Sequence, residues 1–422
     1  MRAPPRRDSG EVREMKNVGG RQWSRWQRAV TGLAIGVLVV VSGFVWRAVT
    51  ATVTITPSWT YDIGYGTSAP AVADGVVYVL GGELGEDRMY ALDAATGKQR
   101  WTRKLPRVPS AVGYSDPVVA EGVVYTTDDG RVYALDAATG EQRWTYDTRN
   151  RARVDFGPAV TGNAVYFSDG TGRVYALDAA TGKQRWTHKT GRGGFRPVVA
   201  GDVVYVGDEV GRMYALDTAT GEQRWTYDTR NRVRVDFGPS VTGNAVYFSD
   251  GTGRVYALDA ATGKQRWTHQ IGFGLYVRPV VADGVVYVGS ARVYALDAAT
   301  GEQRWISETS GPYVSVTLAG GVVYVRNIEG DMYALDAATG EQRWTYEVSD
   351  GDYYPDDSVV ADGVVYLDDD GENIVHALDA ATGEQRWTYE TGSEIYRPVV
   401  ADGVVYISTS SDKVHALRAA TG

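Results

Sequence analysis

Residues 90–101 read Tyr-Ala-Leu-Asp-Ala-Ala-Thr-Gly-Lys-Gln-Arg-Trp, and this phrase recurs along the chain with few substitutions. The part from the aromatic residue to the Gly occurs nine times between Tyr90 and Gly422, and eight copies carry a Trp four residues after the Gly. Successive glycines are 38 to 43 residues apart. That period is typical of the blades of a β-propeller and of related repeat arrays.

The ninth copy ends at Gly422 and therefore has no Trp of its own. Near the start of the array, however, Trp59-Thr60-Tyr61-Asp62 matches the segment Trp225-Thr226-Tyr227-Asp228. We therefore expect the N-terminal strand to complete the last repeat. In a closed ring this arrangement leaves no open sheet edge. An open solenoid would gain nothing from it.

Each repeat predicts four strands, as the sixth unit illustrates. An inner strand begins at Arg278-Pro279-Val280-Val281, and a second strand follows at Val285–Val288 after an Asp-Gly turn. The third strand is Arg292–Asp297, and the outer strand is Glu302–Trp305 after a Thr-Gly turn. Runs of β-branched and aromatic residues between such turns are strong hairpin signals. The sequence therefore predicts an all-β propeller with four-stranded blades.

The repeated pattern Ala-x-Asp-x-x-Thr-Gly-x-x-x-Trp resembles the tryptophan-docking motif of pyrroloquinoline-quinone-type β-propellers, and the resemblance extends over all the repeats. It implies that each Trp packs between neighbouring blades against the turn that holds the motif Gly, while the Asp and Thr bond that turn. The last copy departs from the pattern, because Arg418 stands where the Asp belongs. The docking residues expected on this basis are Trp59, Trp101, Trp144, Trp186, Trp225, Trp267, Trp305, Trp344 and Trp387.

Counting the units gives nine, whereas the related propellers usually have eight blades. Residues Thr145–His188 recur as Thr226–His269 with only two changes, so two blades were duplicated together. A single nine-bladed ring follows if Trp59 completes the ninth unit, since each repeat must bury its face against neighbours. An eight-bladed ring with one displaced unit is the alternative.

The first 47 residues differ from the array. Residues 1–28 carry eight Arg and Lys against three acidic residues, and Ala29–Trp46 then runs without a charge. Such a run spans about 27 Å as a helix, close to the ~30 Å core of a bilayer. The sequence predicts a basic cytoplasmic tail (1–28), a transmembrane anchor or uncleaved signal (29–47) and an extracytoplasmic propeller (48–422). A cleaved signal peptide ending near Val49-Thr50-Ala51 is the alternative.

Composition restricts the chemistry further. The chain has no Cys, which excludes disulfides, thiolate metal sites and attachment of a lipid through Cys. Its net charge is -9, and the array from Ala48 onward holds 34 Lys and Arg against 49 Asp and Glu. Because this field opposes nucleic acid and anionic lipid headgroups, we expect no nucleic-acid partner.

The connections that lead into the inner strands vary most between units, and they should share one face of the ring. Several of them place Arg beside an aromatic residue, a composition found at binding hot spots and in carboxylate recognition. Arginines that bridge to an Asp of the next blade are the structural alternative. The candidate partner-binding residues are Phe195, Arg196, Tyr276, Arg278, Tyr396, Arg397, Arg151 and Arg232.

Nearly uniform repeats supply equivalent groups, whereas a cofactor or catalytic site needs a few different polar groups that converge. We therefore predict no catalytic residue, cofactor or metal, and a non-catalytic, monomeric scaffold for a protein partner at the cell envelope, tethered to the membrane. The chain is similar to the propeller lipoprotein of the outer-membrane β-barrel assembly machinery, although that protein's lipid anchor requires a Cys. The resemblance also implies two alternatives, a quinone-dependent alcohol or sugar dehydrogenase and a binder of carbohydrate or envelope polymer.

Overall fold

The computed structural model divides the chain between Thr50 and Ala51, and the second unit is Ala51–Gly422. All residues that the structure describes belong to the second unit. They run from Ile55 to Arg418 with gaps at 66–67, 84–85, 107–114, 128–129, 150–151, 155–156, 194, 236–237, 273–277, 309–312, 349–357, 370 and 412. The predicted tail and membrane anchor at 1–47 lie outside this range.

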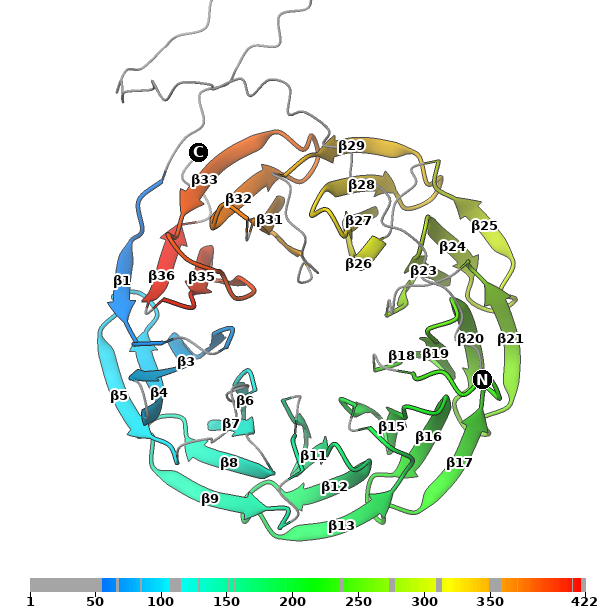
Figure 1. Cartoon of the computed structure of the whole chain (residues 1–422), viewed down its shortest axis with the longest axis horizontal. Helices are drawn as coiled ribbons and strands as arrows, with labels where there is room; N and C mark the ends of the chain where they lie inside the picture. The colour runs from blue at the N-terminus through cyan, green and yellow to red at the C-terminus, as the bar shows by residue number, and fades with distance from the viewer. Residues whose placement is uncertain are drawn as a thin grey trace, which may run out of the picture. The chain divides into compact units, whose positions relative to one another are not determined.

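The described residues form nine four-stranded antiparallel sheets arranged in a ring (Figure 1). The chain is therefore a propeller with nine blades, which excludes the eight-bladed count. Blades 1 to 4 are β2 (Ala71–Ala73), β3 (Val76–Glu83), β4 (Glu86–Asp93), β5 (Gln99–Lys104); β6 (Val118–Ala120), β7 (Val123–Thr127), β8 (Arg131–Asp136), β9 (Gln142–Asp147); β10 (Ala159–Thr161), β11 (Ala164–Ser168), β12 (Arg173–Asp178), β13 (Gln184–Lys189); and β14 (Val198–Ala200), β15 (Val203–Gly207), β16 (Arg212–Asp217), β17 (Gln223–Asp228).

Blades 5 to 8 are β18 (Ser240–Thr242), β19 (Ala245–Ser249), β20 (Arg254–Asp259), β21 (Gln265–Gln270); β22 (Val280–Ala282), β23 (Val285–Gly289), β24 (Val293–Asp297), β25 (Gln303–Ile306); β26 (Tyr313–Ala319), β27 (Val322–Asn327), β28 (Met332–Asp336), β29 (Gln342–Tyr346); and β30 (Val359–Ala361), β31 (Val364–Asp369), β32 (Ile374–Asp379), β33 (Gln385–Glu390). Blade 9 combines β34 (Val399–Ala401), β35 (Val404–Ser408) and β36 (Lys413–Arg418) with β1 (Trp59–Asp62).

The N-terminal strand closes the ring, as the sequence predicted. Trp59 pairs with Ala416 and Asp62 with Lys413, so β1 is the outer strand of blade 9 (Figure 1). We call this pairing of β1 with β36 the seam. The first strands of neighbouring blades contact each other on the inside of the ring, for example β2 with both β6 and β34.

The turn between the first two strands of a blade follows the Asp-Gly signal. Asp283 has a φ of 49° and Gly284 a φ of 72°. Two consecutive residues in the left-handed region are the mark of a type I′ turn, whose twist matches that of the strands it joins. Val280–Ala282 therefore pairs with Val285–Tyr287, and the inner hairpin forms from its own local sequence.

The hydrophobic core lies between the blades rather than within them. Trp186 of blade 3, for example, packs with Tyr166 of its own blade and with Val204 and Tyr214 of blade 4. Its indole Nε1 donates a hydrogen bond to the carbonyl of Thr218 in the next blade, 2.8 Å away. Seven further indoles make the corresponding bond, at Trp59, Trp101, Trp144, Trp225, Trp267, Trp305 and Trp344.

The turn of the repeated motif is held by its Asp. Asp136 Oδ1 accepts a hydrogen bond from the backbone N–H of Thr139 at 2.9 Å, and its Oδ2 pairs with Arg143 at 2.8 Å. These contacts hold the pKa of Asp136 at about 2, with the Arg143 hydrogen bond as the largest cause. The turn that follows Arg418 in blade 9 lies outside the described residues.

Candidate functional site

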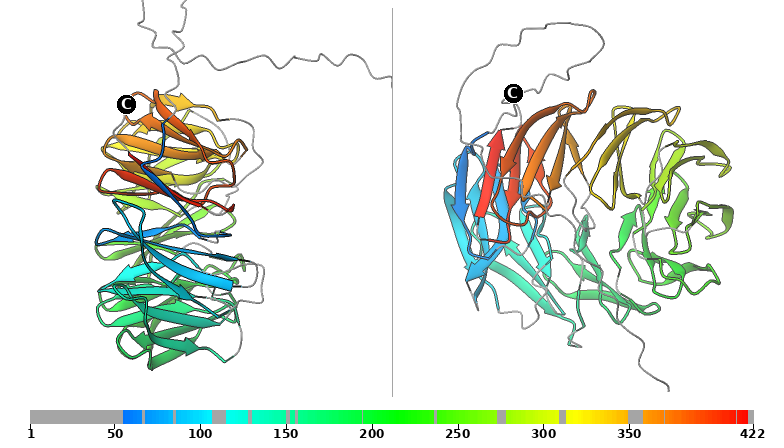
Figure 2. Two further views of the ribbon diagram at one scale, coloured as in Figure 1. Left: turned by 90° about the vertical axis from the view of Figure 1, so that its left-hand side faces the viewer. Right: turned by 45° about the horizontal axis from the view of Figure 1, so that its top comes forward.

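One face of the ring carries all the connections between blades. Strands alternate in direction, so the fourth strand of a blade ends at the face where the first strand of the next blade begins. We call this the loop face; Figure 2 shows the ring edge-on, with its two faces at the sides. Arg196, Arg278 and Arg397 each lie on it, one residue before a buried Pro that leads into an inner strand. A Pro there costs no ladder hydrogen bond, because the strand has not yet begun.

The residues before these prolines form the innermost ring of the loop face. A methyl group built on Gly157 would lie 3.2 Å from the carbonyl oxygen of Asp116 in the preceding blade. On Gly238 it would lie 3.3 Å from the carbonyl oxygen of Arg196. Corresponding positions in neighbouring blades therefore touch, and their side chains surround the axis of the propeller.

Three arginines of this face interact through their charges, although they come from blades 4, 6 and 9. Desolvation lowers the pKa of Arg196 below its ordinary value, and the positive charges of Arg397 and Arg278 lower it further. Arg196 still reaches solvent, as do the other two. The guanidinium groups are thus close enough to repel one another, and Arg196 is partly desolvated.

Asp116 of blade 2 joins the same cluster. Its Oδ1 accepts a hydrogen bond from the backbone N–H of Ala69 in blade 1, at 2.9 Å. Desolvation raises the pKa of this carboxyl group, and the charges of Arg397 and Arg196 oppose the rise. Asp116 therefore offsets part of the positive charge, and the channel holds three cations beside one described anion.

Within the described residues, Arg196, Arg278 and Arg397 make no hydrogen bond or ion pair. The arginine before each docking Trp behaves differently, because it pairs with the Asp of its motif turn, as Arg143 does with Asp136. Among the described residues, no bridge links these three side chains to an Asp of a neighbouring blade. Their donors are free to bind a partner.

The other candidate residues contribute unequally. Phe195 and Tyr396 are half-buried beside Arg196 and Arg397, and burial raises the pKa of the Tyr396 hydroxyl. Arg232 is exposed in the connection between β17 and β18, and no described interaction links it to the three arginines. Tyr276 and Arg151 lie outside the described residues.

Sequence reasoning missed two features. Asp116 was not proposed as a site residue, although its position before Pro117 is the one that Arg196 occupies in blade 4. A run of aspartates such as Asp368–Asp370 suggests a solvated turn, but Asp368 and Asp369 are buried in β31. Asp368 pairs at 2.7 Å with Arg326, which is itself buried, and this pair joins blades 7 and 8.

Neither a metal centre nor a membrane span occurs in the described part of the chain. No group of three or more His, Asp or Glu side chains there could hold a metal ion. The same residues contain no helix that is long and apolar enough to cross a bilayer.

Comparison with models of known protein families identifies the family to which this propeller belongs. The sequence model of the family described as outer membrane protein assembly factor BamB matches residues 9–193, 170–273 and 271–422. The chain belongs to this family. The resemblance to the pyrroloquinoline-quinone-type propellers, drawn from the docking motif, is thereby confirmed. No match was found among curated proteins.

Solved structures with the same fold include one BamB protein and several enzymes. BamB from Moraxella catarrhalis is 22% identical, over 71% of this chain and 95% of that one, with a TM-score of 0.59. A europium-containing methanol dehydrogenase is 18% identical over 84% of both chains, with a TM-score of 0.56. The quinohemoprotein alcohol dehydrogenase ADHIIG from Pseudomonas putida HK5 is 18% identical over 72% of this chain and 74% of that one, with a TM-score of 0.54. At these identities the likeness establishes the fold alone.

Proposed function

We propose that this member of the BamB family is a membrane-tethered, extracytoplasmic propeller that binds a protein partner at its loop face and catalyses no reaction. The observation that carries the proposal is the cluster of Arg196, Arg278 and Arg397, whose donors are free at the mouth of the channel. Arg is enriched at binding hot spots, where its planar fork pairs with carboxylates. The family description, which names an assembly factor, supports a partner at the envelope.

Capture of the partner tests the role of the loop face. Full-length protein would be cross-linked in an envelope extract and compared with a variant carrying Arg196→Gln, Arg278→Gln and Arg397→Gln. We expect recovery of a defined partner to fall at least tenfold, since losing even one charge-assisted contact costs about 1.5–3 kcal/mol. A control with Lys98→Gln, Arg103→Gln and Lys183→Gln removes the same charge from exposed positions outside the connections between blades. Equal recovery by both variants would contradict the proposal.

The tether rests on the basic residues 1–28 and the apolar run within 29–47. Fractionation tests it: the full chain should sediment with membranes and resist extraction by high salt, whereas a chain beginning at residue 48 should be released. A protease added outside spheroplasts should digest the propeller of the full chain. Recovery of the full chain in the soluble fraction would overturn the tether.

The dehydrogenases among the structural relatives make catalysis the competing function. Pyrroloquinoline quinone would be titrated with Ca²⁺ while thermal unfolding and dye-linked oxidation of alcohols and sugars are followed. We expect neither a saturable rise in melting temperature nor turnover. A saturable rise in melting temperature together with turnover would contradict the scaffold function and show that the protein is an oxidoreductase.

A further inference from the structure

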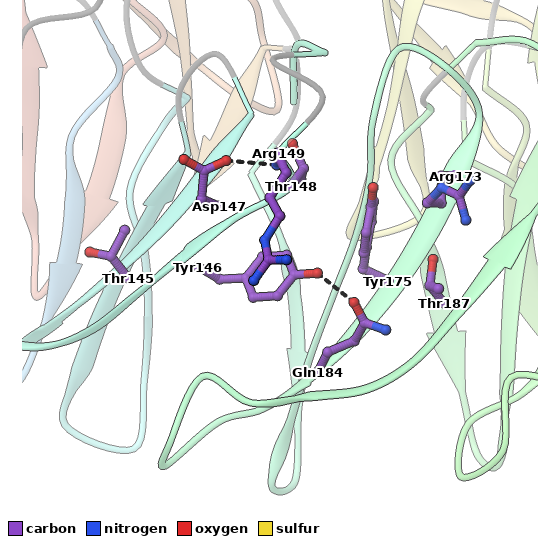
Figure 3. Close-up of a pocket in the computed structure, with 9 residues that line it drawn as sticks. All are labelled: Thr145, Tyr146, Asp147, Thr148, Arg149, Arg173, Tyr175, Gln184 and Thr187. Carbon is purple, nitrogen blue, oxygen red and sulfur yellow. Dashed lines mark hydrogen bonds between the residues drawn. The ribbon is translucent and has the colours of Figure 1, made fainter.

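A second site lies away from the channel, between blades 2 and 3. A cavity of about 770 Å³ opens there (Figure 3), within the size range of ligand pockets. β9, the turn after it, β12 and β13 supply its walls. The lining residues are Thr145, Tyr146, Asp147, Thr148, Arg149, Arg173, Tyr175, Gln184 and Thr187. None of them is aliphatic, so the cavity suits a ligand rich in hydroxyl groups better than the apolar core of a protein interface.

Several of these polar groups are already used within the protein. Tyr146 donates to Gln184 Oε1 at 2.5 Å, and Asp147 Oδ1 accepts from the backbone N–H of Arg149 at 2.6 Å (Figure 3). Tyr175 donates to Asp169 Oδ2 at 2.8 Å. These bonds fix the walls of the cavity and use part of its acceptor capacity, and the Asp147 carboxylate also pairs with Arg131 at 3.4 Å.

The donors that remain free are cationic or neutral. No described hydrogen bond or ion pair engages the guanidinium groups of Arg149 and Arg173 or the amide NH₂ of Gln184. Burial raises the pKa of Tyr146, and the charges of Arg149 and Arg173 both oppose the rise, so both guanidinium groups lie near that hydroxyl. A ligand that pairs with these free donors must carry a negative charge and hydrogen-bond acceptors.

The backbone of Arg149 is in the left-handed region, with a φ of 62°. The same position, five residues after a docking Trp, is Gly64 at the interface of blades 9 and 1, Gly272 after blade 5 and Gly392 after blade 8. All three have a positive φ, of 67°, 103° and 81°. A long L side chain thus occupies a position that is a left-handed Gly at three other interfaces, although the same position is Pro106 after blade 1 and Gly191, without a positive φ, after blade 3. Such strain is kept where a side chain has a task.

The arrangement occurs twice, between blades 2 and 3 and between blades 4 and 5. All nine lining residues recur at an offset of 81. Tyr227 donates to Gln265 Oε1 at 2.5 Å, Asp228 accepts from the N–H of Arg230 at 2.7 Å, and Arg230 has a φ of 63°. The interface of blades 9 and 1 keeps the first of these contacts, from Tyr61 to Gln99, but has Gly64 in place of the arginine. This interface is an internal control, because it keeps the tyrosine contact but lacks the arginine.

We infer that these two interfaces are equivalent binding sites for a carboxylate-bearing polysaccharide, with Arg149 and Arg230 as the residues that take the carboxylate. Arg173 and Gln184, with their copies Arg254 and Gln265, supply donors beside it, although Arg254 Nε also donates to Gln270 Oε1 at 3.3 Å. The partly exposed rings of Tyr146 and Tyr227 offer a surface for the sugar. Two identical sites on one rigid ring match a polymer whose charged unit repeats, and occupying both would raise its avidity. The inference does not rest on the proposed scaffold function.

Substituting the strained arginines tests this without threatening the fold. Arg149→Gly with Arg230→Gly restores the residue found at the control interface, so the melting temperature of the full-length protein should stay unchanged or rise. Short oligogalacturonates would be titrated calorimetrically. The native protein should bind two per chain, Arg149→Gly alone should bind one, and the double variant should bind at least tenfold more weakly. The variant with Lys98, Arg103 and Lys183 changed to Gln should bind as the native protein does.

Matched polymers separate the chemistry of the ligand. Neutral dextran should not bind, and dextran sulfate and polyglutamate should bind at least tenfold more weakly than polygalacturonate. Equal binding of polyglutamate would show that an acidic peptide is the ligand and would overturn the inference. So would equal binding of dextran sulfate, a stoichiometry that Arg149→Gly leaves at two, or no binding of polygalacturonate by the native protein.

Discussion

The ring of Trp225 lies against the α-carbon of Gly263, and this contact shows what a single residue contributes to the propeller. A Cβ on Gly263 would lie 2.6 Å from Trp225 Cδ2, and its φ is 67°. Both the close approach and the backbone conformation therefore require Gly. Burying an indole removes about 150–250 Å² from water, so each docking pair stabilises its interface strongly.

Gly263→Ala and Gly243→Ala separate the two requirements. Gly243 also has a positive φ, of 56°, but nothing lies within 4 Å of a Cβ there. We expect Gly243→Ala to lower the free energy of unfolding by about 1–2 kcal/mol, the cost of the left-handed backbone alone. Gly263→Ala should cost at least about 2 kcal/mol more, because the indole must move. Chemical denaturation measures both, and equal losses would show that the indole contact is weak.

His415 makes stability depend on pH. It occupies a position that is Tyr in most repeats, and desolvation and then Lys413 lower its pKa to about 4. Its Nε2 has no partner. The unfolded chain, with an ordinary pKa near 6.5, therefore binds the proton first, and stability is lost as pH falls from about 6.5 towards 4.

His415→Tyr should remove that part of the slope. The free energy of unfolding of the native chain should drop by on the order of 2 kcal/mol more than that of the variant between pH 7 and pH 4. Urea titrations of both proteins at several pH values measure the difference. His376, whose pKa is also lowered by burial, contributes equally to both and cancels. Parallel curves would rule His415 out as the cause.

At this scale the sequence showed the docking residues but not the strained ones. Trp and Gly recur at fixed spacing, so their contact could be inferred from the period alone. Arg149 also stands at a fixed distance from its Trp, but its spacing does not reveal the sign of φ. The alignment of Arg149 with Gly64 was the available signal.

The strands act through the connections that join them. Each inner strand follows a buried Pro or its equivalent, and the residue before it faces the axis. The sequence predicted that Arg196, Arg278 and Arg397 share a face, because all three follow an outer strand. The sequence did not predict that the charges of these arginines interact, because that depends on the number of blades between them and on the width of the ring.

β1 is the element whose removal should have the largest effect. Deleting residues 1–62 takes Trp59 from Gly97 and leaves β36 with an open edge. We expect a lower melting temperature and concentration-dependent association, because an unpaired strand recruits another chain. Sedimentation velocity would detect the association, with a chain lacking only residues 1–54 as the control. A peptide of residues 55–65 should restore the monomer; a stable monomer without it would contradict this role of the seam.

Considered as a whole, the molecule is a ring of nine similar interfaces, so the place of the seam should be arbitrary. A permuted chain would begin at Lys264, end at Gly263 and join Gly422 to Trp59 through Glu-Gln-Arg, the spacing of the other repeats. Blade 5 would then be closed by a strand from the other end, as blade 9 is now. We expect its free energy of unfolding to lie within about 2 kcal/mol of that of residues 55–422.

A second permutation tests whether a shared strand matters. Opening the ring within 309–312, between blades 6 and 7, leaves no blade that combines both ends of the chain. This form should unfold faster than the first in stopped-flow denaturation, because the two terminal blades are held together only by side-chain contacts. Equal unfolding rates would mean that the seam gives the ring no kinetic protection.

The seam also sets an order in time. β1 precedes every other strand of the propeller in the chain, yet its partner β36 is the final strand. A chain made from its N-terminus folds its early blades first. β1 must therefore wait, without a sheet to join, while eight blades are completed. For that whole interval the nascent array is an open arc with two ends, and it is the period in which a chaperone or a second chain has access to both.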